Sequence, residues 1–186
     1  MKLGELLDRI RGSYVERLQA AVREAKDPNP EPAYRRRDGS LAREGPLALP
    51  ARGDLFTEGE MVSVDSKTLL SFEPLEFTWE GSLRVVLGPF PWDALPLFLE
   101  GSRPDSNWSP LLRWFEAWFD GEDVRSPGSD GLCGVVHFLS DPLPAEGGVR
   151  FSIDLGSAPV AAFEELLDAA ARLGPARLKI GETDNA

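Results

Sequence analysis

Prolines place the firmest limit on the fold of this chain. Proline lacks a backbone N–H and blocks regular helix, and residues 27–54 contain five of them: Pro28, Pro30, Pro32, Pro46 and Pro50. Over the whole chain, sixteen prolines and eighteen glycines predict many short, tightly bounded loops. We therefore expect residues 27–54 to form a linker, or a strap that lies over the surface.

Residues 1–26 have the pattern of an amphipathic helix. Apolar side chains recur there at three- and four-residue steps, which places them on one helix face: Leu3, Leu6, Leu7, Ile10, Tyr14, Leu18, Ala21 and Val22. A stripe this continuous must be buried against the rest of the chain or against a second chain. Residues 3–22 are therefore also a candidate surface for a homo-oligomer.

After residue 60 the spacing of apolar residues is that of short strands. Leu75, Phe77 and Trp79 alternate with polar residues, as in a strand with one buried face. We expect strands at 61–65, 68–72, 75–79 and 82–87, with a hairpin at Gly81, and then a short, proline-broken helix within 88–101. A second helix follows at 109–120, then strands at 132–139 and 149–155, a helix at 159–173 and a strand at 176–180.

This order of elements predicts an α+β fold over residues 55–186. We expect a mostly antiparallel sheet packed by two or three helices, preceded by the N-terminal amphipathic helix and the proline-rich strap. The last strand follows a helix, so it can pair in parallel with an earlier strand.

Charge and composition narrow the functional classes. The net charge is −11, and residues 51–186 hold ten basic and twenty-three acidic side chains. An acidic body repels nucleic acid and attracts basic proteins.

No apolar run approaches the ~18 residues that cross a bilayer, and Glu5 and Asp8 interrupt any export signal. The single cysteine, Cys133, and the excess of arginine over lysine favour the cytoplasm of a bacterium with a GC-rich genome.

Residues 109–123, SPLLRWFEAWFDGED, form the most aromatic segment. Its large apolar side chains fall within an arc of roughly 160° on a helix, as a helix packed on a sheet requires. Tryptophan is also enriched at binding hot spots, so the same helix is the candidate partner surface. The residues proposed for it are Trp114, Trp118, Glu116, Asp120, Glu122 and Asp123.

Candidate catalytic residues are few. In a strand, Cys133 and His137 would lie about 13 Å apart, too far for a nucleophile and its base. The strand–helix joint around Asp154 and Ser157 could hold an anion, and an enzyme of this sequence would use Asp154, Ser157 and His137. Four acids near element ends are candidates for acid–base pairs: Asp65, Asp93, Asp141 and Asp154. One histidine and one cysteine cannot form the usual zinc clusters, so we expect no metal and no cofactor.

The leading functional hypothesis is a small acidic protein that binds a basic partner protein, in the manner of an immunity protein that neutralises a toxin or enzyme. The alternatives are a carboxylate-dependent small-molecule hydrolase and an assembly component that acts through the N-terminal helix. No catalytic or cofactor motif decides among the three.

Overall fold

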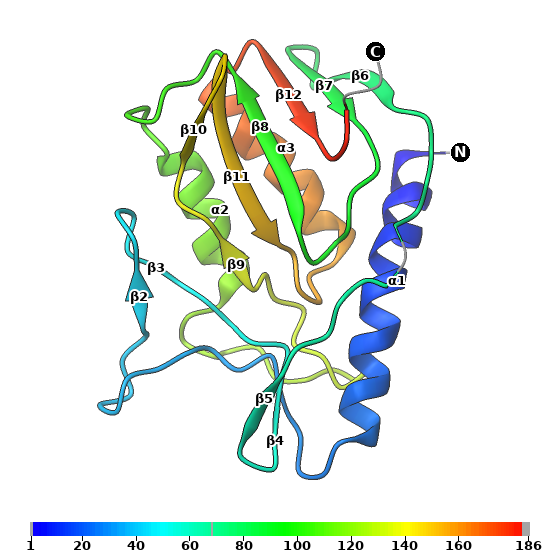
Figure 1. The fold of residues 1–186 in the computed structure, drawn as a ribbon, viewed down its shortest axis with the longest axis vertical. Coiled ribbons are helices and arrows are strands. Elements are labelled where there is room, and N and C mark those ends of the chain that lie inside the picture. The colour runs from blue at the N-terminus through cyan, green and yellow to red at the C-terminus, as the bar shows by residue number, and fades with distance from the viewer. Residues whose placement is uncertain (1, 68, 184–186) are drawn as a thin grey trace.

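The computed structural model describes residues 2–67 and 69–183 and shows an α+β fold built on one mixed sheet (Figure 1). Its strands run in the spatial order β10 (Leu143–Ala145), β11 (Gly148–Asp154), β8 (Leu95–Glu100), β12 (Arg177–Ile180), β7 (Leu83–Leu87) and β6 (Leu75–Trp79). The short strand β9 (Phe138–Leu139) also pairs with β11. Every pairing is antiparallel except that of β12 with β7, which is parallel.

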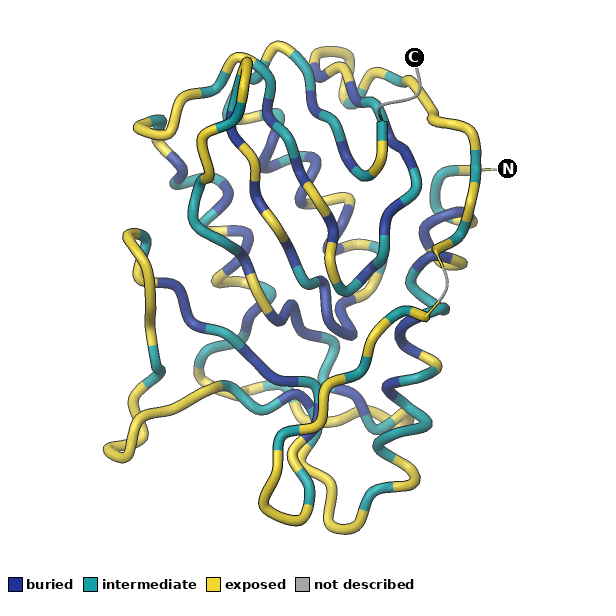
Figure 2. The backbone as a smooth tube through the Cα atoms, in the orientation of Figure 1, coloured by how far each residue is buried: buried dark blue, intermediate teal, exposed yellow. Residues whose placement is uncertain are grey.

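Helices α2 (Ser109–Phe119) and α3 (Val160–Leu173) cover one face of this sheet (Figure 1). Strands facing them alternate between buried and more exposed residues, as Figure 2 shows for β8 and β11. Pro110 lies at the start of α2, where proline is favoured, and Gly174 ends α3 in the left-handed conformation. The apolar core therefore lies between the sheet and these two helices.

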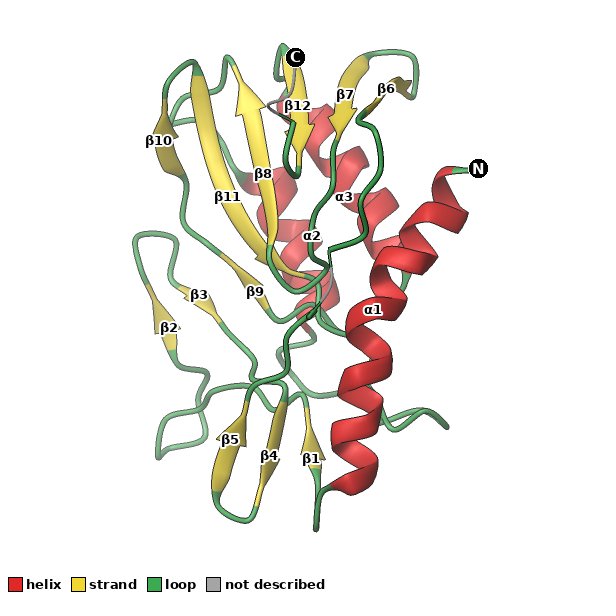
Figure 3. Cartoon of the chain, turned by 45° about the vertical axis from the view of Figure 1, so that its right-hand side comes forward, coloured by secondary structure: helices red, strands yellow, loops and turns green. Residues whose placement is uncertain are grey.

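Helix α1 (Leu3–Glu24) packs against the body of the same chain (Figure 3). Its buried side chains join the core that the sheet and the other helices form: Leu6, Leu7, Ile10, Tyr14, Val15 and Leu18. The helix contacts α3 and β4 (Leu55–Thr57). The apolar stripe of residues 3–22 is thus covered within the chain. No helix of the described residues is long and apolar enough to span a membrane.

Residues 27–54 form a strap across the end of the sheet. It contains β1 (Asn29–Pro30), which pairs with β4, and the hairpin of β2 (Arg43–Glu44) with β3 (Leu49–Pro50). Strand β4 pairs in turn with β5 (Glu60–Val62), and Figure 3 shows this small sheet below the large one. Glu31 and Arg52 of the strap are buried, so the strap is part of the packed molecule.

The structure confirms the α+β class and most of the expected elements, and it corrects four. The strand expected at 61–65 is β5, which ends at Val62, so residues 63–65 form no strand. Residues 88–101 contain no helix; they contain β8, the strand between β11 and β12. Residues 132–137 are irregular, and only Phe138 and Leu139 of the expected strand pair with a neighbour. Residues 69–72 form no strand, and Thr68 lies outside the described residues.

Candidate functional site: a buried histidine among three carboxylates

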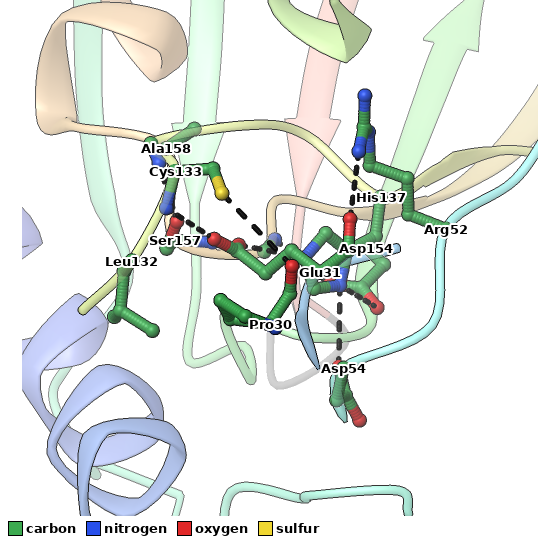
Figure 4. A network of polar contacts seen from close by, with 12 residues as sticks. Pro30, Glu31, Arg52, Asp54, Leu132, Cys133, His137, Asp154, Ser157 and Ala158 are labelled. Atoms are coloured by element: carbon green, nitrogen blue, oxygen red, sulfur yellow. Dashed lines mark hydrogen bonds and ion pairs between the residues drawn. The ribbon is translucent and has the colours of Figure 1, made fainter. Parts of the chain in front are cut away.

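His137 is the fully buried centre of a polar network (Figure 4). It precedes β9 in a loop that runs between the strap and β11. Its backbone N–H donates to Asp154 O at 2.9 Å, and its carbonyl accepts the N–H of Arg52 at 2.9 Å. The main chain of the loop is therefore fastened on both sides, by the strap and by the end of β11.

Glu31 lies against one nitrogen of the imidazole. Its Oε1 is 2.8 Å from His137 Nε2 and accepts the N–H of Ser157 at 3.1 Å. Its Oε2 accepts the N–H of Cys133 at 2.6 Å. Glu31 is fully buried and has a left-handed backbone, with φ of 53°. Every oxygen of this carboxylate is thus used inside the protein.

Arg52 holds the backbone of Glu31 in place. Its Nη1 donates to Glu31 O at 2.7 Å, while its other nitrogens donate to Phe119 O, Asp120 O and Asp123. The guanidinium also lies over the Phe119 ring, 4.8 Å from its centre. One buried side chain therefore ties the strap to the end of α2.

Two aspartates lie on the other side of the imidazole. His137 Nδ1 is 3.2 Å from Asp54 Oδ1 and 3.5 Å from Asp154 Oδ2. Neither oxygen is placed to accept a hydrogen bond, so Nδ1 is buried without a hydrogen-bond partner among the described residues. Asp54 accepts the Tyr14 hydroxyl at 2.6 Å and the Val64 N–H at 2.6 Å. Asp154 Oδ1 accepts the N–H of Gly156 at 2.8 Å.

The carboxylates set the charge of the site. Burial by itself lowers the pKa of His137, but attraction to Asp154 and the contacts with Asp54 and Glu31 raise this pKa well above its ordinary value. Burial raises the pKa of Glu31 and of Asp54. The contacts of both carboxylates with His137 outweigh it, together with the hydrogen bonds from Ser157 and Cys133 to Glu31 and from Tyr14 and Val64 to Asp54, so both pKa values are lowered. With no other cation bound, the site therefore holds an imidazolium between carboxylates.

Gly156 lets the strand–helix joint pack directly on the imidazole. Its φ is 51°, and a Cβ at this position would lie 2.3 Å from His137 Cδ2 and 2.4 Å from Val135 O. Any larger residue would collide with the ring and with the backbone. The glycine after β11 is thus required by the close approach of the histidine.

The structure brings two of the three proposed catalytic residues together. Asp154 lies 3.5 Å from the imidazole of His137, but the hydroxyl of Ser157 bonds elsewhere. It accepts the N–H of Gly134 at 2.8 Å, and the residue is 1% exposed. Ser157 therefore braces the 131–137 loop. The remaining candidate acids have other partners: Asp65 pairs with Arg17, Asp93 accepts the hydroxyl of Ser66, and Asp141 accepts the N–H of Leu47.

The residues proposed for partner binding divide between core and surface. Trp114 is 5% exposed and donates to Ala162 O at 2.8 Å, so it belongs to the α2–α3 interface. Trp118 is half-buried; its Nε1 donates to Glu165 at 2.8 Å, and Arg125 lies over its ring.

The acids of that segment also divide. Asp120 accepts the N–H groups of Val124 and Arg125, and Asp123 pairs with Arg35 and Arg52. Glu116 and Glu122 are exposed. Two of the four acids thus act within the chain.

Comparison with protein-family models, curated proteins and solved structures found no match to this chain.

Proposed function

We propose that the protein binds a basic partner protein through the outer surface of α2 and α3, in the manner of an immunity protein that neutralises a toxin or enzyme. The observation that carries the proposal is the half-buried Trp118 of α2, whose indole N–H donates to Glu165 of α3. The single cysteine and the arginine-rich composition favour a bacterial cytoplasm as the site of action.

The outer surface of the two helices is suited to such a partner. Trp118 exposes part of a large aromatic ring, the type of residue that dominates binding energies. Four exposed glutamates lie on the same two helices and the turn after α2: Glu116, Glu122, Glu164 and Glu165. Arg125 lies over the Trp118 ring, so a partner would displace this side chain or pack beside it, and the exposed glutamates would attract a basic rim on that partner. The net charge of −11 would also speed the encounter with it.

A hydrolase is the second candidate, because Asp154 Oδ2 lies 3.5 Å from His137 Nδ1. It ranks lower because a nucleophile must be within hydrogen-bonding reach of its base, and the Ser157 hydroxyl instead accepts the N–H of Gly134. An assembly role for α1 ranks lower still, because its apolar stripe is already covered.

The test compares two double charge reversals that change the net charge equally. Glu116→Lys with Glu122→Lys alters the proposed surface, and Glu76→Lys with Glu146→Lys alters exposed positions elsewhere, on β6 and on the turn after β10. Native mass spectrometry of each tagged chain, purified from its own host, measures the complexes formed. We expect the unaltered chain and the control to retain a stoichiometric basic partner, and the first variant to bind it at least about tenfold more weakly.

The proposal fails if the unaltered chain is recovered only as a monomer or homo-oligomer. It also fails if both double variants bind the partner with the same affinity, because the helix surface would then play no part.

A further inference from the structure

We propose that Asp54, His137 and Asp154 form a binding site for one divalent transition-metal ion of the Zn²⁺ type. The three ligand atoms are His137 Nδ1 and one carboxylate oxygen from each aspartate, and all lie within 4.8 Å of one another. They come from the strap, the loop before β9 and the end of β11, as Figure 4 shows. This inference is independent of the proposed partner surface on α2 and α3.

The spacing of the ligand atoms fits a single ion. Bonds of about 2.1 Å in a tetrahedral arrangement separate neighbouring ligand atoms by about 3.4 Å. In the structure His137 Nδ1 is 3.2 Å from Asp54 Oδ1 and 3.5 Å from Asp154 Oδ2. Two of the three distances between ligand atoms thus match the spacing that one ion requires, and the two aspartate oxygens lie within 4.8 Å of each other.

The nitrogen that faces this space, His137 Nδ1, lies close to the two aspartates but makes no hydrogen bond with either. His137 is fully buried, and its Nδ1 lacks a hydrogen-bond partner among the described residues. A buried polar atom left unpaired costs stability, and coordination to a cation removes that cost. Asp154 Oδ2 also points toward this space, because the N–H of Gly156 is bonded to the other oxygen, Oδ1.

The surrounding groups hold the ligands in the orientation that a metal requires. Glu31 lies 2.8 Å from His137 Nε2 and can keep the proton there, which leaves the Nδ1 lone pair for the ion. Such carboxylate–histidine–metal arrangements are the usual second layer of metal sites. Tyr14 and the N–H of Val64 bind Asp54 in the same supporting way.

The chemistry of the ligands selects the ion. Imidazole favours zinc and its neighbours in the first transition series, whereas calcium and magnesium prefer oxygen ligands alone. The side chains of Asp54 and Asp154 are 11% and 23% exposed, so an ion can reach the site from solvent and keep a water as its fourth ligand. A bound ion would fasten three segments that are distant in sequence.

The experiment uses the untagged full chain, stripped with a chelator and titrated with Co²⁺, which reports its ligands through visible absorption. We expect one Co²⁺ per chain, displaced by Zn²⁺, and no charge-transfer band from the thiolate of Cys133. X-ray absorption of the Zn²⁺ form should show nitrogen and oxygen neighbours with one imidazole. Two outcomes would overturn the proposal: the absence of stoichiometric binding at micromolar Co²⁺ or Zn²⁺, or a sulfur atom among the neighbours of the ion. The three side chains would then form only an ion-paired cluster around a protonated His137.

Matched variants locate the ion. Asp154→Asn and Asp54→Asn keep the shape of each ligand but remove its charge, and each should weaken Zn²⁺ binding at least tenfold. Asp141→Asn is the control, because Asp141 is a partly exposed aspartate that also accepts a backbone N–H, that of Leu47. Circular dichroism verifies that each variant is folded. Equal affinity in all three variants would rule out this site, whereas the X-ray absorption result stands even if a variant fails to fold.

Discussion

Glu31 is the single residue on which the buried network depends most. Its two oxygens accept the N–H groups of Ser157 and Cys133 and meet the imidazole of His137. Glutamine has the same shape, but its amide offers one acceptor oxygen and places an NH₂ group against at least one of these donors. The substitution therefore removes a charge and leaves a buried donor unpaired.

We expect Glu31→Gln to lower the free energy of unfolding by about 3 kcal/mol, the scale found when one partner of a buried ion pair is removed. Urea unfolding at pH 7 in the presence of EDTA measures the effect without any metal contribution. Glu44→Gln is the control, because Glu44 is exposed on β2, and it should change stability by less than about 0.5 kcal/mol. Equal effects of the two substitutions would show that the Glu31 contacts contribute no net stability.

Cys133 gives a prediction about pH. Burial, with Glu31 nearby, raises the pKa of its thiol to about 11. At pH 8 roughly 0.1% of such a thiol is ionised, against roughly a quarter of a free thiol with a pKa near 8.5. Iodoacetamide should thus modify the folded chain at least about 100-fold more slowly than the urea-unfolded chain.

The rate for the folded chain should climb about tenfold for each pH unit between 8 and 10, because the thiolate is the reacting form. Mass spectrometry of timed samples measures it. A rate at pH 8 close to that of the unfolded chain would contradict the raised pKa.

Only part of this site could be predicted from the sequence. His137, Asp154 and Ser157 attract attention as a lone histidine and a strand–helix joint. Glu31 and Asp54 are ordinary acids within and at the end of a proline-rich segment, and their contacts with His137 span 106 and 83 residues of chain. No local pattern encodes such contacts; they follow from how the strap crosses the end of the sheet.

Among the elements, those whose apolar residues recur at a regular spacing were predicted well. The segment of residues 88–101, which contains several prolines, was not. The hairpin of β6 and β7, the helices α1, α2 and α3, and the strands β11 and β12 lie where the apolar spacing places them. The sequence predicts a short, proline-broken helix over residues 88–101, and the structure has the central strand β8 there instead. Leu95, Leu97 and Leu99 in fact alternate with more exposed residues, and Pro96 lies on the exposed face.

Helix α1 yields a prediction at this scale. Leu18 is fully buried in the core, so Leu18→Ala should lower the free energy of unfolding by about 2–5 kcal/mol through lost apolar contacts and a cavity. Arg23→Ala, at an exposed position of the same helix, is the control and should cost under about 0.5 kcal/mol. Thermal unfolding at two protein concentrations measures both.

The same measurement tests where α1 is docked. A helix packed on its own chain gives a melting temperature that does not depend on concentration. A melting temperature that rises with concentration, together with a small effect of Leu18→Ala, would show that the stripe is buried between chains instead.

Across the whole molecule, the first fifty residues neutralise part of the acidic body. Arg17 pairs with Asp65 and Arg35 with Asp123. Arg11 donates to the carbonyls of Ser157 and Ala158 at the start of α3. Three arginines of this region thus bind the body, and the strap and α1 are held by these polar contacts as well as by apolar packing.

The final prediction concerns this dependence of the body on residues 1–50. Their removal takes away the six buried side chains of α1 and the Glu31 carboxylate, and it exposes the apolar surfaces that they cover. His137 would then face Asp54 and Asp154 without its third carboxylate. We expect residues 51–186 alone to lack a cooperative thermal transition and to aggregate, whereas the full chain in the same buffer unfolds in one step. Calorimetry and the dispersion of amide NMR signals compare the two chains. A cooperative transition with dispersed signals from residues 51–186 would contradict this expectation. The body would then be an independent domain to which α1 and the strap are accessory.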